Sequence, residues 1–170
     1  MLQIINLAHN NFSGEIPRRS LTTWWSMMAN KDDSLVEVKF LEFSLEAGRD
    51  GIGFSIEDGI TVTSKGSEMD LRKILSIFTL IDFSCNNFSG TEEIGEFQSL
   101  YVLNLSGNAL TGEIPSSFGN MRVLESLDLS QNKLSGQIPP QLAKLTFPSF
   151  LNLSNNQLVG RIPTSTQFST

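Results

Sequence analysis

Short apolar stretches recur along the second half of the chain, each followed at a fixed distance by asparagine, glycine and proline. The repeated phrase is Leu-x-Leu-x-x-Asn-x-Leu-x-Gly-x-Ile-Pro, which occupies 103–115, 127–139 and 151–163. An incomplete copy covers 81–90, and a fifth copy covers 5–17. The asparagines of the three full copies lie 24 residues apart, at Asn108, Asn132 and Asn156. This period predicts a solenoid, in which a repeat forms one coil and buries its apolar edge only against neighbouring coils.

Within each copy, apolar and polar residues alternate as they do in a short β-strand. In the first full copy, Leu103 and Leu105 fall on one side, whereas Val102, Asn104 and Ser106 fall on the other. Stacked coils would therefore form a curved parallel sheet with a leucine-rich inner face and a small, polar outer face. The pattern predicts a leucine-rich repeat solenoid of the α/β type.

The asparagine and glycine columns have separate mechanical roles. Each asparagine can hydrogen-bond backbone groups of its own turn and of the next coil, which would form a ladder through the stack. The glycine of each Gly-x-Ile-Pro segment permits a tight backbone path. One variable column holds His9, Cys85, Gly107, Gln131 and Asn155. We interpret this column as tolerant surface.

Between the first copy and the other four, the phrase disappears. Residues 18–75 contain eight Lys/Arg and ten Asp/Glu, against four and eight in the rest of the chain. We interpret this stretch as an inserted island, so the chain divides into one coil at 1–17, the island at 18–75 and four coils at 76–170. Within the island, 60–63 predicts a strand, and the apolar spacing over 68–78 predicts a helix.

Composition and charge argue against two classes of function, nucleic-acid binding and catalysis. A formal net charge of −6 without a stripe of Lys and Arg argues against nucleic-acid binding. The single histidine, His9, has no catalytic partner in the sequence, and no Cys/His spacing suits zinc. We therefore expect no catalytic residues, no metal and no cofactor, and the chain is not predicted to be an enzyme.

The sequence gives conflicting indications about whether the protein is exported from the cell or anchored in a membrane. No signal peptide precedes the first coil, and no apolar run reaches the roughly 18 residues of a membrane span. Four Asn-x-Ser sequons nevertheless are candidate glycosylation sites in an exported protein, at Asn11, Asn87, Asn104 and Asn152. The repeat phrase is itself rich in Asn and Ser, so these sequons are also expected in a protein that is not glycosylated.

The order of one coil, an island and four coils resembles the carboxyl-terminal ectodomain of plant receptor-like proteins of the disease-resistance type. The likeness is densest over 61–66 and 73–88, and it includes the Gly-Glu-Ile-Pro and Gly-Gln-Ile-Pro endings. It implies a plant-specific leucine-rich repeat on the extracellular side of the plasma membrane, where the parent protein would act in defence signalling. The implied partners are a peptide or protein ligand and the ectodomain of a receptor-kinase co-receptor.

Candidate contacts for such partners come from two places. Four are polar outer-face positions of the coils, and two belong to the island next to its densest match. They are Asp82, Asn104, Asp128, Asn152, Lys65 and Gly66.

Several departures leave other functions open. The copy at 81–90 lacks the Ile-Pro step, and Asn86 and Asn108 are only 22 residues apart, so this coil must close differently. A secreted inhibitor of a cell-wall-degrading enzyme is one alternative, although that class has an uninterrupted solenoid. An unproductive, truncated gene copy is another, because capping segments are missing. Uncapped end coils are expected to expose apolar side chains.

Overall fold

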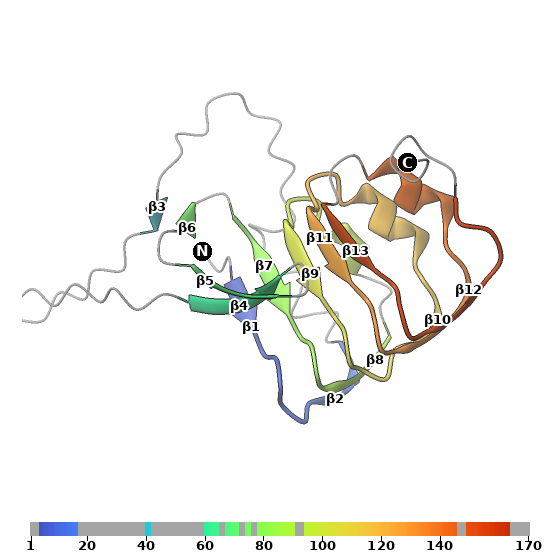
Figure 1. Ribbon diagram of the computed structural model, residues 1–170, viewed down its shortest axis with the longest axis horizontal. Helices are drawn as coiled ribbons and strands as arrows, with labels where there is room; N and C mark the ends of the chain where they lie inside the picture. Colours follow the sequence, from blue (N-terminus) through green and yellow to red (C-terminus); the bar gives the residue numbers. More distant parts are fainter. Residues whose placement is uncertain are drawn as a thin grey trace, which may run out of the picture.

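The main feature of the computed structural model is a five-stranded parallel sheet to which each coil contributes one strand (Figure 1). The structure describes residues 4–16, 40–41, 60–64, 67–71, 74–75, 78–90, 94–145 and 149–163. In spatial order the strands are β1 (Ile4–Asn6), β7 (Leu80–Asp82), β9 (Val102–Asn104), β11 (Ser126–Asp128) and β13 (Phe150–Asn152). We number the coils 1 to 5 in this order. The solenoid prediction is confirmed.

The register of the sheet follows the repeat columns. Leu103 lies beside Leu127, and Leu127 lies beside Leu151. Leu105 and Leu129 are fully buried, and the partly buried Leu153 packs against the same core. The leucine side chains therefore line up on neighbouring coils and form one continuous core, as the alternation predicts.

The asparagine ladder is present, but it points to the preceding coil and not to the next one. Asn132 accepts a hydrogen bond from the Leu110 amide at 3.1 Å and donates to the Leu105 carbonyl at 2.9 Å, both in coil 3. It also donates to Leu129 and Ser130 in its own turn. Equivalent bonds are made by Asn86, Asn108 and Asn156.

A second layer of strands and 3₁₀-helices completes the coils. The strands form two separate sheets: β2 (Ser13–Glu15) with β8 (Asn87–Ser89), and β10 (Thr111–Glu113) with β12 (Lys133–Gln137) and β14 (Gln157–Val159). The break between them falls at the shortened coil 2. The helices are η1 (Ile94–Glu96), η2 (Ser116–Asn120) and η3 (Pro140–Lys144). Coil 2 thus closes differently, as its missing Ile-Pro step indicates.

The region predicted as an island is described only in part, so its extent stays a prediction. Coil 1 pairs directly with coil 2, although residues 18–75 lie between them in the sequence. Between them, β4 (Ile60–Ser64) and β5 (Ser67–Leu71) form an antiparallel hairpin, and β3 (Phe40–Leu41) pairs with β6 (Ile74–Leu75). The strand expected at 60–63 is confirmed, whereas the helix expected over 68–78 is wrong. Ser67–Leu71 instead pair along their whole length with β4, so the backbone groups of β5 find partners across the hairpin and not within a helix.

Candidate functional site

Four of the predicted contact residues stand in a single row across the outer face of the main sheet. Register places Asp82 beside Asn104, Asn104 beside Asp128, and Asp128 beside Asn152, while Asn6 extends the row at coil 1. The regular stacking of the coils produces this alignment. The other two predicted contacts, Lys65 and Gly66, fall outside the described residues, between the paired Ser64 and Ser67 of the hairpin.

Each side chain in this row also holds the turn that follows its strand. The Oδ1 atom accepts a hydrogen bond from the amide two residues ahead, at 3.0 Å for Asp82 and 2.9 Å for Asp128. Asn104 and Asn152 do the same and also accept from a serine hydroxyl. These short-range bonds are Asx turns, which explain why Asp and Asn recur here. The main role of these side chains is therefore to stabilise the turns. Only the polar atoms that do not take part in an Asx turn can contact a partner.

The outer face of coils 2 and 3 is covered. Leu80 and Val102 point away from the leucine core, yet they are 0% and 3% exposed and form a second apolar cluster with Phe78 and Tyr101 packed against it. The hairpin strand β4 contacts β9 at this position, and Figure 1 shows the hairpin crossing this side of the sheet. The prediction of a uniformly small, polar outer face is therefore wrong for coils 2 and 3.

Burial divides the row into two halves. Asp82 and Asn104 are 0% and 3% exposed, so neither can contact a partner in this arrangement. The Oδ2 atom of Asp82 is buried and has no hydrogen-bond partner among the described residues. By contrast, Asp128 and Asn152 are half-buried, and Asn152 donates to Asp128 Oδ2 at 3.2 Å. Of the four predicted contacts, the accessible ones thus belong to coils 4 and 5, and Asn6 of coil 1 is exposed as well.

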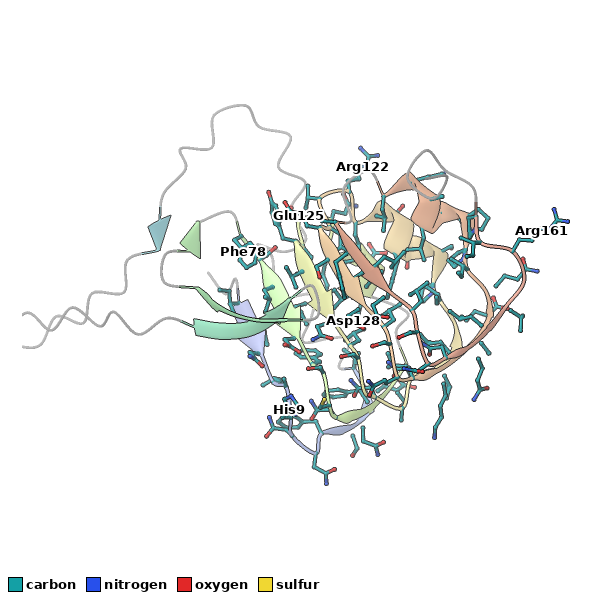
Figure 2. All side chains as sticks on the ribbon, viewed as in Figure 1. His9, Phe78, Arg122, Glu125, Asp128 and Arg161 are labelled. Atoms are coloured by element: carbon teal, nitrogen blue, oxygen red, sulfur yellow. The ribbon has the colours of Figure 1, made fainter. Side chains whose placement is uncertain are left out.

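Two carboxylates and an aromatic ring line this accessible part. Glu125 precedes β11, Asp128 ends it, and Phe150 begins β13; all three are half-buried. Figure 2 shows Asp128 on the sheet, with Glu125 and the exposed Arg122 along one edge. The arrangement offers negative charge beside an apolar contact, which suits a basic or amide-rich chain better than an acidic one.

The four sequons differ in accessibility. Asn11 and Asn87 are exposed. Asn152 is half-buried, and its amide nitrogen is bonded to Asp128. Asn104 is buried and holds its own turn, so its side chain is closed to an enzyme that would attach a glycan. Asn11 and Asn87 are the better placed candidates.

No other site chemistry is evident in the described part of the chain. Among those residues, no group of three or more His, Cys, Asp and Glu side chains is placed to hold a metal ion. None of the helices in the described segments is long and apolar enough to cross a membrane.

Comparison with known proteins gives a consistent set of relatives. Leucine-rich repeat family models match residues 98–158, 1–19 and 149–168. The chain is 40% identical to Receptor-like protein 53 of Arabidopsis thaliana over 107 residues, which is 61% of this chain and 10% of that protein. It is 42% identical to Receptor-like protein 34 of the same plant over 108 residues, with the same two shares. The chain thus spans 10% of the length of these relatives.

Solved structures show the same fold. The chain resembles the Arabidopsis receptor kinase HAESA, solved in complex with the peptide hormone IDA and the co-receptor SERK1, with a TM-score of 0.57 and 31% identity. That match covers 95% of this chain and 18% of the other. It also resembles a TDR receptor with a TM-score of 0.58 and 24% identity, covering 95% of this chain and 19% of that one. The second likeness shows the fold alone.

Proposed function

We propose that this chain, which belongs to the leucine-rich repeat proteins, is a non-enzymatic recognition module of a plant cell-surface receptor-like protein. It binds a peptide or protein ligand and the ectodomain of a receptor-kinase co-receptor, on the extracellular side of the plasma membrane and in defence signalling. The observation that carries the proposal is the accessible part of the outer face in coils 4 and 5. The receptor-like relatives and the HAESA complex support it.

The surface favours an extended segment with basic residues. Asp128 and Asn152 lie side by side on adjacent strands, so their polar atoms follow the long axis of the stack. Glu125 adds a second carboxylate at the edge of the same coil. A bound segment that crosses the strands would place Lys or Arg near Glu125 and Asp128 and an apolar side chain on Phe150.

Lys65 and Gly66 belong to the proposal by their place in the sequence, between the two strands of the hairpin. They join the two strands of the hairpin in sequence, and β4 of that hairpin contacts β9. We assign them to the co-receptor side of the interface, together with the coils next to the hairpin. Asn11 and Asn87 are the glycan acceptors in an exported form of the protein.

A pair of charge-reversal variants tests the ligand surface. The immobilised chain is exposed to synthetic peptides graded in net charge, and binding is measured by surface plasmon resonance. We expect basic peptides to bind and Glu125→Lys to weaken that binding by about fivefold or more, mainly through slower association at low salt. Glu113→Lys makes the same change of charge on the exposed strand β10, in the other layer of the coil, and should leave binding unchanged.

A second arm tests the co-receptor. The soluble SERK1 ectodomain is passed over the wild-type chain and over Lys65→Glu, with the best basic peptide present. Retention of SERK1 by the wild type and its loss in Lys65→Glu are expected. Absence of any peptide or SERK1 binding, or equal loss in Glu125→Lys and Glu113→Lys, contradicts the proposed function.

A further inference from the structure

The carboxylate of Asp82 is buried with only one of its two oxygen atoms in a hydrogen bond. Its Oδ1 atom accepts from the Ser84 amide at 3.0 Å, whereas its Oδ2 atom has no partner within the described residues. Asp128 holds the same column in coil 4, and there Oδ2 accepts from Asn152 at 3.2 Å. A buried carboxylate oxygen without a donor is unfavourable. Asp82 therefore lacks the second donor that its counterpart has.

The cover over Asp82 is a local feature of the outer face. Asp82 and Asn104 are buried, whereas Asp128 in the same row is half-buried, although it has a coil on each side. Stacking of coils alone therefore does not bury this column. The hairpin of β4 and β5 contacts β9, the strand that ends at Asn104, and Figure 1 shows it crossing this side of the sheet. The position of the hairpin accounts for the difference.

Among the described strands, the hairpin shares no pairing with the sheet that it covers. Strand β4 pairs with β5 along its whole length, and the two form a separate sheet, while β7 and β9 pair with each other beneath them. Lifting the hairpin would leave both sheets intact, but it would expose Leu80 and Val102, which are buried on this face. Burial of these two side chains favours the closed arrangement, and the unpaired oxygen of Asp82 opposes it.

Without the hairpin, the outer face would present two carboxylates at a fixed spacing. Asp82 and Asp128 belong to strands two apart in the main sheet, and paired strands lie about 4.8 Å apart, so the carboxylates would be about 10 Å apart. A chain in the polyproline II conformation repeats its side-chain direction every third residue, over about 9 Å. Two basic residues three positions apart in such a chain therefore match the two carboxylates.

We propose that the hairpin of β4 and β5 is a removable cover, and that a basic polyproline II segment displaces it to bind Asp82 and Asp128 together. This inference rests on the proposed function, since it extends the ligand surface of coils 4 and 5 to coils 2 and 3. A Lys or Arg of the segment donates to Asp82 Oδ2, the atom that lacks a donor in the closed arrangement. The hairpin and the ligand compete for one part of the sheet, so closure lowers the apparent affinity of any ligand that needs coils 2 and 3.

Thiol labelling without any ligand tests whether the cover opens. In a Cys85→Ser background, Val102→Cys places a thiol on the covered face of β9, and Leu103→Cys places one on the core face of the same strand. Each labelling rate is compared with the rate that global unfolding of the same variant allows, as measured by urea denaturation. We expect the thiol at position 102 to react at least tenfold faster than this limit, and the thiol at position 103 to react at the limit. Reaction of both thiols at the limit, or of both above it, overturns the proposal.

A charge-neutralising variant tests the part played by the buried carboxylate. Asp82→Asn keeps an acceptor for the Ser84 amide and removes the buried charge, so it should hold the cover closed. We expect labelling of Val102→Cys to slow by about threefold or more in this variant. Glu113→Gln removes the same charge from the exposed strand β10 and should leave the rate unchanged. An unchanged or faster rate in Asp82→Asn contradicts the opposition between carboxylate and cover.

Two capped peptides of equal composition test the ligand, Pro-Pro-Lys-Pro-Pro-Lys-Pro-Pro and Pro-Pro-Pro-Lys-Lys-Pro-Pro-Pro. In surface plasmon resonance we expect the first to bind the full chain at least fivefold more tightly, Asp82→Asn to abolish this preference, and Glu113→Gln to keep it. Equal binding of the two peptides, or a preference that survives Asp82→Asn, overturns this inference and leaves the proposed function standing. If neither peptide binds, the proposed function and this ligand are both overturned, while the labelling rates still decide whether the cover opens.

Discussion

Coils 4 and 5 carry the same sequence phrase, yet their side chains meet different surroundings. Leu127 of coil 4 is fully buried, whereas Leu151 in the same column of coil 5 is half-buried. The difference does not come from residue type, because both are leucine and both belong to paired strands. It comes from the neighbours: in the described part of the chain, coil 4 has a coil on both sides and coil 5 has one on a single side.

This comparison shows where the stability of the solenoid resides. A single repeat has little stability of its own, and most of its stability comes from contacts with the coil on either side, as expected for a quasi-one-dimensional stack. The same substitution should therefore have unequal effects in the two coils. The following predictions test this difference, beginning with the largest effect.

Removal of a core leucine should show the largest difference. Leu127→Ala creates a cavity inside a stack that is closed on both sides, and we expect it to lower the free energy of unfolding by about 2 to 5 kcal/mol. Leu151→Ala should cost less than half as much, because solvent already reaches that side chain. Urea denaturation of both variants in dilute solution provides the measurement. Equal losses would contradict the dependence on neighbouring coils.

Removal of an asparagine of the ladder should have the second largest effect on stability. Asn132→Ala deprives the buried Leu110 amide and Leu105 carbonyl of their partner, which we expect to cost about 2 to 3 kcal/mol. Asn10→Ala removes two bonds at an exposed turn, so its cost should stay below about 1 kcal/mol. The shift of the denaturation midpoint gives the comparison. A larger shift for Asn10→Ala would show that the ladder does not couple adjacent coils.

A methyl group at Gly119 should test the contact between 3₁₀-helices. A Cβ atom there would lie 2.5 Å from the carbonyl oxygen of Gln141 in η3. Gly119→Ala therefore forces η2 and η3 apart, and we expect a loss of about 1 to 2 kcal/mol. The exposed neighbour provides the control, since Asn120→Ala should change the melting temperature very little. A neutral Gly119→Ala would mean that these helices are not packed in this way.

Glycine in the variable column should produce the smallest effect, and a favourable one. Gln131 adopts φ of 54°, a left-handed conformation that costs an ordinary side chain about 1 to 2 kcal/mol. After the entropy that glycine loses on folding is subtracted, Gln131→Gly should stabilise the fold by about 0.5 to 1 kcal/mol. Asn155→Gly should gain less, because Asn tolerates this conformation. A loss of stability in Gln131→Gly would disprove the explanation.

Much of the fold could be predicted because the repeat columns have direct physical meanings. The alternation around Leu103 and Leu105 identified the strands and the inner face, and the 24-residue spacing of Asn108, Asn132 and Asn156 identified the ladder. The spacing could not tell which neighbour each asparagine contacts. That direction depends on the path of the backbone, and the contacts prove to be with the preceding coil.

Other features depended on contacts between distant segments. Leu80 and Val102 stand where coil 4 has Ser126, which was a signal that the outer face changes character, but nothing local indicates what covers them. The apolar spacing over 68–78 fits a helix by itself, and only pairing with β4 makes part of it a strand. Phe78 lies at the end of this stretch and packs beside Tyr101 in the outer cluster.

The variable column provided a signal that sequence reasoning missed. All five of its residues have positive φ, from 53° at Cys85 to 64° at Gly107. Gly107 and Asn155 are residue types that favour this conformation, whereas the residue types of His9, Cys85 and Gln131 do not indicate it. The column was interpreted as tolerant surface because its side chains are unlike one another, although what its members share is a backbone conformation.

Amide hydrogen exchange measured residue by residue in dilute solution tests the role of the neighbouring coil most directly. The amides of Leu105 and Leu129 donate to the next coil at 2.8 and 2.9 Å, while Leu153 occupies the same column with no coil beyond it in the described structure. We predict strong protection at Leu105 and Leu129 and rapid exchange at Leu153. Protection of Leu153 equal to that of Leu129 in dilute solution, or rapid exchange at all three, would contradict the account.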